Sequence, residues 1–211
     1  MIRYFVRTTG KRKLDSSYSQ IEYELLIDNE GNCGKAFLKQ LEYVNDFDAV
    51  LLEDDLILCN NFKNRIEQVI SKHSNDIINF FTIPEEYLKS DYLKSFCYNQ
   101  CTYFPKGIAK KIIEAFNSYG YNPYSAEKIM KKALKKLQMK HYVYRPCLVQ
   151  HLDDGSLMNH NLSYKRRSPY FIEYLDELGI SYEEAKIKEN KEKLMSLMEE
   201  KFKDIDKNKN Q

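Results

Sequence analysis

An uninterrupted apolar run that ends in three acids constrains the fold of this chain more than any other feature. Residues 49–52 read Ala-Val-Leu-Leu, the acids Glu53, Asp54 and Asp55 follow, and residues 56–58 are apolar again. A short continuous apolar run predicts a strand that is buried on both faces. Adjacent carboxylates beside a core repel one another, and a divalent cation such as Mg²⁺ or Mn²⁺ would neutralise them. The alternative is a strand that runs into an acidic surface turn, but the apolar residues on both sides favour the cation.

Size and composition fit one medium globular domain with a small appendage. The chain has 211 residues, of which 43% are apolar and 30% charged, as in ordinary soluble proteins. No run approaches the roughly 18 apolar residues of a membrane span, so we expect no stable membrane anchor, and residues 1–7 are too short and too charged for a signal peptide. Five cysteines without a Cys-x-x-Cys pair predict reduced thiols and a cytoplasmic protein. A net charge of +2 does not by itself indicate a nucleic-acid partner.

Predicted strands and helices alternate along most of the chain. We expect strands at residues 3–8, 21–27, 49–52, 77–83, 101–104 and 142–149, and helices at residues 34–44, 62–70, 107–119 and 125–138, the second of them capped by Asn61. This order predicts an α/β fold with a mostly parallel sheet flanked by helices. Further helices are predicted at residues 169–178 and 181–203, before a frayed tail. We therefore expect a main domain at 1–162 and a C-terminal helical extension at 163–211.

A histidine follows the last predicted strand of the main domain. His151 lies about a hundred residues after the acids. Because the carboxyl ends of parallel strands share one edge of a sheet, His151 and Asp55 are predicted to reach the same ion. Carboxylate and imidazole ligands suit a divalent transition ion such as Mn²⁺. The alternative is a half-buried histidine whose hydrogen bonds are satisfied within the protein.

Two segments resemble nucleotide-sugar-dependent glycosyltransferases with the GT-A fold, in a small, phage-like form. Val50–Asp55, followed by Leu56 and Phe62, resembles their Asp-x-Asp region. Pro146–His151, followed by Ser156, resembles the late segment that supplies a metal-ligand histidine in many of them. The first motif reads Glu-Asp-Asp here instead of strict Asp-x-Asp. The resemblance covers roughly residues 3–162 and implies a GT-A-like, Rossmann-like catalytic domain.

The resemblance also implies a reaction and a set of donor-binding residues. A sugar would be transferred from a nucleoside diphosphate sugar, with a UDP-sugar as the first candidate, to a hydroxyl acceptor. Mn²⁺ or Mg²⁺ would bridge the two phosphates and offset the charge of the leaving group. Asp55 would be the direct metal ligand together with His151, and Glu53 or Asp54 would meet the ribose or reach the metal through water. The other residues expected to hold the donor are Arg7, Thr8, Thr9, Lys11, Arg12, Asp28 and Ser156.

An inverting reaction needs a carboxylate base that accepts the proton of the acceptor hydroxyl. Glu127 is the candidate, because it begins the helix predicted at 125–138 just after an aromatic loop, where the resemblance places the catalytic acid. The alternative is a first-turn acid that only interacts favourably with the helix dipole. Asp153 and Asp154 are reserve candidates, and a retaining mechanism stays open.

Lysines and arginines interleaved with tyrosines raise the question of the acceptor. Cations alternating with aromatic rings suit an anionic polymer with stacking bases. The acceptor is therefore predicted to be a hydroxymethylated base in DNA, as for some phage-type glycosyltransferases, or else a glycan. Tyr124, Lys131, Lys135 and Arg166 are the predicted acceptor-binding residues. The alternative is a solvated lysine face on an ordinary helix.

Two other classes of function fit the same residues. One is a nucleic-acid-binding protein whose acidic cluster is only structural. The other is a metal-dependent nucleotidyltransferase or phosphohydrolase, since these enzymes also use carboxylates at strand ends. If a phage encodes the chain, the predicted cytoplasmic location is that of the host.

Overall fold

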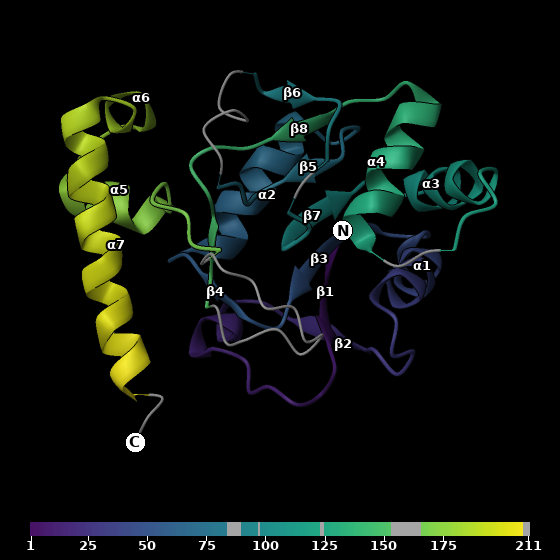
Figure 1. Cartoon of the computed structure of the whole chain (residues 1–211), viewed down its shortest axis with the longest axis horizontal. Coiled ribbons are helices and arrows are strands. Elements are labelled where there is room, and N and C mark those ends of the chain that lie inside the picture. The colour runs from purple at the N-terminus through teal and green to yellow at the C-terminus, as the bar shows by residue number, and fades with distance from the viewer. Residues whose placement is uncertain (84–89, 97, 123–124, 153–165, 209–211) are drawn as a thin grey trace.

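The strand that ends in the acids lies inside a mixed sheet (Figure 1). The computed structural model describes residues 1–83, 90–96, 98–122, 125–152 and 166–208. Within these residues the sheet has seven strands in the order β2 (Tyr23–Ile27), β1 (Ile2–Thr8), β3 (Asp48–Glu53), β7 (Cys101–Phe104), β5 (Ile78–Asn79), β8 (His141–Val143) and β6 (Tyr92–Leu93). All of them point in one direction except β7 and β6, which run the opposite way. The predicted α/β fold with a mostly parallel sheet is confirmed at this level.

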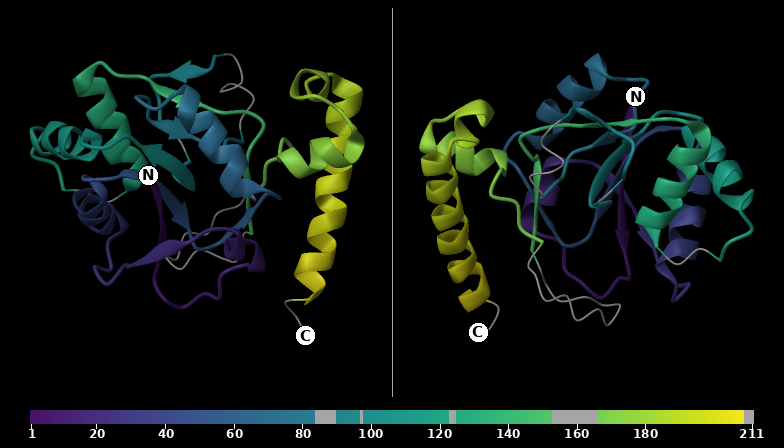
Figure 2. Two further views of the ribbon diagram at one scale, coloured as in Figure 1. Left: turned by 180° about the vertical axis from the view of Figure 1, so that it is seen from behind. Right: turned by 45° about the horizontal axis from the view of Figure 1, so that its top comes forward.

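Helices cover both faces of the sheet (Figures 1 and 2). On one face lie α1 (Cys33–Val44), α3 (Ile108–Asn117) and α4 (Ala126–Leu137). On the other face lie α2 (Phe62–Lys72) and, farther out, α5 (Ile172–Leu178), α6 (Tyr182–Ala185) and α7 (Lys188–Asn208). None of the helices in the described residues has the length and apolarity needed to cross a membrane. The cytoplasmic location stays a prediction.

Burial on both faces explains the continuous apolar run of β3. Val50 and Leu52 point into the core on the α2 side, and Ala49 and Leu51 point into the core on the α1 side. All four side chains are fully buried. Successive side chains of a strand point to opposite faces, so a strand between two helical layers needs apolar residues at every position.

Side-chain hydrogen bonds fix several helix starts. The side chain of Asn32 accepts a hydrogen bond from the Lys35 backbone and caps α1. Ser125 caps α4 in the same way through the Lys128 backbone. Asn61 occupies the N-cap position of α2 as predicted, but it has a left-handed backbone (φ 58°) and its side chain makes no capping hydrogen bond.

Three predicted elements differ from the structure. The strand predicted at 77–83 is only Ile78–Asn79, because the Asn79 side chain accepts a hydrogen bond from the Phe81 backbone and so competes with the ladder. The strand predicted at 142–149 is divided between β8 and a second sheet, with the cis peptide Arg145–Pro146 between them. The helix predicted at 181–203 is two helices, α6 and α7.

The C-terminal helices contribute to the core on the α2 side of the sheet. Leu194 and Phe202 of α7 belong to the same buried cluster as Val50 and Leu52 of β3. The guanidinium carbon of Arg167 lies 3.6 Å from the centre of the Phe202 ring. The boundary predicted at 162/163 lies in residues outside the described ranges, and the division into two domains stays a prediction.

Phe202→Ala is expected to lower the free energy of unfolding of the whole chain by about 3–5 kcal/mol, the usual cost of truncating a buried aromatic residue. Urea denaturation followed by circular dichroism measures the change. Met195→Ala on the exposed side of α7 is the control, with an expected change below about 0.5 kcal/mol. Separate unfolding of α7, with an unchanged midpoint for the rest of the chain, would contradict the shared core.

Candidate metal centre

A bend after β3 leads into a second sheet that brings a distant histidine beside the acids. The chain leaves β3 at Glu53, turns through Asp54 and Asp55, and re-enters extended structure as β4 (Leu56–Leu58). β4 pairs antiparallel with β9 (Val149–His151), and Leu56 lies opposite His151. The backbone N–H of Leu152 donates to the carbonyl oxygen of Asp55 at 2.8 Å. His151 therefore reaches the acids through this second sheet, whereas we had expected it on the edge of the main sheet.

Three side chains offer ligand atoms to one position. One ligand atom each from Glu53, Asp55 and His151 lies within 4.8 Å of the other two. Asp55 and His151 are 6% and 7% exposed, and Asp55 Oδ2 lies 3.4 Å from His151 Nε2. The other oxygen of Asp55, Oδ1, is buried and has no hydrogen-bond partner among the described residues. An orphaned carboxylate oxygen costs free energy in a core, and this donor set fits a divalent cation such as Mn²⁺ or Mg²⁺.

Two arginines compensate the acids in this arrangement. Arg12 Nη1 lies 3.1 Å from Asp54 Oδ1 and 2.7 Å from Asp55 Oδ2. Arg7 Nη2 donates to Glu53 Oε1 at 3.0 Å and also to the backbone oxygen of Asn99. Two positively charged arginines thus pair with three negatively charged carboxylates. One negative charge of this group is left for a metal ion to compensate.

The loop after β1 also holds the acids. Thr8 Oγ1 donates to Asp54 Oδ2 at 2.6 Å and accepts a hydrogen bond from the Gly10 backbone at 2.8 Å. Gly10 has φ +74°, a conformation that favours glycine. The polar residues predicted at this strand end therefore fix the position of Asp54 directly.

The N-termini of two helices meet at the same end of the sheet. Cys33 is the first residue of α1, and burial raises the pKa of its thiol. A hydrogen bond to the Ala126 backbone at the start of α4 lowers this pKa, while the charges of Glu127 and Glu53 raise it. Because β2 runs parallel to β3 and α1 follows β2, Cys33 and the adjoining start of α4, with Glu127 in its first turn, lie on the side of the molecule where β3 ends.

The other predicted donor residues occupy the same region in different ways. Thr9 has a buried Oγ1 without a hydrogen-bond partner among the described residues. Asp28 follows β2, and its backbone N–H donates to the Thr8 carbonyl at 2.7 Å. Lys11 is exposed in the loop after β1. Ser156 lies outside the described residues.

The predicted acceptor residues do not form one cluster in the described part of the chain. Lys131 and Lys135 are exposed on α4. Arg166 precedes α5, and α5 lies on the opposite side of the sheet from α4 (Figure 1). Its neighbour Arg167 is 7% exposed and packs on the Phe202 ring, so it does not contribute to an exposed basic surface. Tyr124 and the reserve acids Asp153 and Asp154 lie outside the described residues.

Several residues that position the site were not predicted. Tyr18 is buried and donates its hydroxyl to the backbone oxygen of Glu53. Burial, followed by the charge of Asp55, holds the Tyr18 pKa well above its usual value, so the hydroxyl remains a donor. Gln150 is buried, and its side chain makes two hydrogen bonds with the Ser168 backbone beside His151. No sequence signal identifies these residues, because their partners are distant in the chain.

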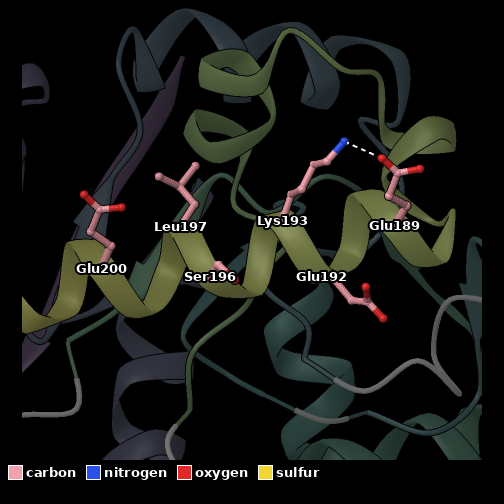
Figure 3. A pocket seen from close by; sticks show the side chains of 6 residues that line it. All are labelled: Glu189, Glu192, Lys193, Ser196, Leu197 and Glu200. Atoms are coloured by element: carbon pink, nitrogen blue, oxygen red, sulfur yellow. Dashed lines mark hydrogen bonds and ion pairs between the residues drawn. The ribbon is translucent and has the colours of Figure 1, made fainter.

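A hollow on α7 is separate from this centre. It is lined by Glu189, Glu192, Lys193, Ser196, Leu197 and Glu200 (Figure 3). All six side chains come from one helix, and Lys193 Nζ pairs with Glu189 Oε1 at 2.8 Å. Groups from several elements converge at the end of β3 instead, which is where we place the candidate site.

Comparisons with known proteins add little to the geometry. No protein-family model matches the chain, and no curated protein matches its sequence. Among solved structures, the chain is similar to A197 from STIV, with a TM-score of 0.46 and 13% sequence identity. The match covers 71% of this chain and 83% of that chain. A similarity this low carries no functional argument.

Asp55→Asn is expected to weaken Mn²⁺ binding at least about tenfold, because it removes a charged ligand from the centre of the cluster. Isothermal titration calorimetry measures the affinity, and the melting temperature tests the fold. Asp46→Asn is the matched control, since Asp46 is an exposed acid that precedes the opposite end of β3. Equal affinities for the wild type and Asp55→Asn would contradict the assignment of Asp55 as a ligand.

Proposed function

We propose that the protein is a metal-dependent glycosyltransferase of the GT-A type. It would transfer a sugar from a nucleoside diphosphate sugar, with a UDP-sugar as the first candidate, to a hydroxyl acceptor. The observation that carries the proposal is the convergence of Glu53, Asp55 and His151 at the carboxyl end of β3. Open α/β sheets bind ligands beyond the carboxyl ends of their strands. The resemblance of the Glu-Asp-Asp segment to an Asp-x-Asp motif supplies the donor class.

In this proposal, the residues at this end of the sheet bind the metal ion and the diphosphate of the donor. Asp55 and His151 would hold a Mn²⁺ or Mg²⁺ ion, with Glu53 beside them. When bound, such an ion offsets the charge that develops on the departing diphosphate. Arg7 and Arg12 bring two further positive charges to the same place.

Glu127 suits the proton transfer of an inverting reaction. Its carboxylate would accept the proton of the acceptor hydroxyl while the hydroxyl oxygen bonds to the anomeric carbon and the bond to the diphosphate breaks. Two facts support this role. Glu127 lies in the first turn of α4, and the charges of Glu127 and Glu53 both raise the pKa of the Cys33 thiol.

The exposed side of α4 favours an anionic acceptor. Between residues 106 and 140 the chain has nine lysines and only two acids. The apolar side of α4 is already used in the core, through Ala126, Ile129, Met130, Ala133 and Leu134. Lys128, Lys131, Lys135 and Lys136 are exposed and give α4, the helix that carries Glu127, a basic surface. Lys132 Nζ lies 3.0 Å from the centre of the exposed Tyr121 ring. An acceptor in DNA, such as a hydroxymethylated base, would place its phosphates on this surface.

One observation favours a second candidate function. Because Arg7 and Arg12 pair with all three acids, the negative charge of the cluster is partly compensated without any metal ion. A nucleic-acid-binding protein with a structural acidic cluster would show the same ion pairs. Calorimetric titration with UDP distinguishes the two functions. UDP binding that requires Mn²⁺ supports the glycosyltransferase, and the absence of such binding would exclude it.

Transfer itself is tested by a donor screen. Nucleotide sugars are incubated with the protein, Mn²⁺ and one of two acceptors, either DNA that contains hydroxymethylated bases or free glycans. The masses of the products are measured by mass spectrometry. A sugar mass added to the acceptor supports the proposal. Hydrolysis of the donor alone, or addition of a nucleotide mass, would indicate a phosphohydrolase or a nucleotidyltransferase.

Glu127→Gln is expected to reduce kcat by about 10²-fold or more, because glutamine cannot accept the proton, while the affinity for UDP and Mn²⁺ stays near that of the wild type. Steady-state kinetics and calorimetry give the two values. Glu114→Gln, an exposed acid on α3, is the matched control and should leave both values unchanged. An unchanged kcat for Glu127→Gln would exclude Glu127 as the base.

Replacing Lys131 and Lys135 together by alanine is expected to weaken binding to DNA and to reduce the slope of log K against log salt by about 2. Fluorescence anisotropy at several salt concentrations measures this slope. The control replaces Lys188 and Lys203 of α7, which are also exposed and carry the same charge. Equal effects of the two double variants would show that only net charge matters.

A further inference from the structure

Arg12 binds the oxygen of Asp55 that lies close to His151, within the group of side chains that would hold a metal ion. Its Nη1 lies 2.7 Å from Asp55 Oδ2, and that oxygen also lies 3.4 Å from His151 Nε2. The side chains are shielded from water, with 15% of Arg12 and 8% of Asp55 exposed. A divalent cation held by Asp55 and His151 would meet the guanidinium at close range, where like charges repel strongly because the local dielectric constant is low.

The contacts of Asp54 allow Arg12 to leave without exposing a second bare carboxylate. Arg12 binds Asp54 through Oδ1, and Thr8 binds it through Oδ2 at 2.6 Å. Asp54 therefore keeps a short hydrogen bond in the core after Arg12 has moved. Asp55 would exchange one positive partner for another.

The segment that carries Arg12 lies outside the sheet. It joins β1 to the short 3-10 helix at Ser16–Gln20 and forms no strand or helix between them. Lys11 and Lys13, on either side of Arg12, are exposed. Arg12 can thus change partners without disturbing the sheet.

We propose that Arg12 and the divalent cation compete for Asp55, and that the displaced guanidinium then binds the phosphates of the nucleotide. Arg12 compensates the acids while the site is empty of ligands and becomes a diphosphate ligand when the cation has taken Asp55. Guanidinium groups suit both roles, because their planar array of donors fits carboxylate and phosphate alike. This inference rests on the proposed function and names the residue that couples cation binding to nucleotide binding.

The two roles predict opposite effects of one substitution. Arg12→Met should tighten Mn²⁺ binding in the absence of nucleotide by about tenfold, because the competing charge is gone; this factor corresponds to about 1.4 kcal/mol. With Mn²⁺ saturating, the same substitution should weaken UDP binding by about tenfold. Calorimetric titrations of Mn²⁺ alone, and of UDP at saturating Mn²⁺, measure the two affinities.

Two further variants separate this competition from simpler effects. Lys13→Met removes the same charge from the same loop and should change both affinities less than twofold. Arg12→Lys keeps the charge but not the forked geometry, so both affinities should change in the same directions as for Arg12→Met, by smaller factors. Melting temperatures test that each variant is folded, and Arg12→Lys serves if Arg12→Met is not.

The Mn²⁺ and UDP affinities of Arg12→Met distinguish the competition from its alternatives. Unchanged or weaker Mn²⁺ binding by Arg12→Met, with normal binding by the wild type, would show that Arg12 is a structural brace, and the proposed function would stand. Tighter Mn²⁺ binding with unchanged UDP binding would overturn the transfer to phosphate. If neither the wild type nor Arg12→Met binds Mn²⁺, the proposed function and the competition are both wrong.

Discussion

Charge compensation at the carboxyl end of β3 is the constraint on which the rest of the structure depends. Asp54 and Asp55 are each 6% exposed, and carboxylates so deep in a protein are stable only when cations or hydrogen-bond donors surround them. The loop after β1 supplies Arg12 and Thr8, and β1 itself supplies Arg7. The first strands and their connecting loop are thereby fixed around the acids.

The surrounding elements deliver the remaining groups from distant parts of the chain. The β4–β9 ladder pairs His151 with Leu56, the neighbour of Asp55, across almost a hundred residues of sequence. The starts of α1 and α4 meet near Glu53, which brings Cys33 and Glu127 to the same end of the sheet. The candidate site is thus assembled from elements that are far apart in the chain.

Charge is also divided across the whole molecule. The nine lysines between residues 106 and 140 belong mainly to α3 and α4, whereas residues 173–208 have eleven acids and seven lysines and form α5 to α7. These two groups of helices lie on opposite sides of the sheet (Figures 1 and 2). A net charge of +2 therefore conceals a basic side next to Glu127, which suits an anionic partner, and an acidic side away from it.

The sequence by itself determined the α/β class, the buried strand before Glu53 and the helices of the main domain, because hydrophobic periodicity and local capping encode them. It also indicated that the acids and His151 belong together. Only the tertiary structure decided how they meet, since pairing between β4 and β9 depends on residues far apart in the chain. The same reason explains why the hydrogen bond from Tyr18 and the ion pairs of Arg12 emerged only from the folded molecule: local sequence patterns carry no information about such distant partners.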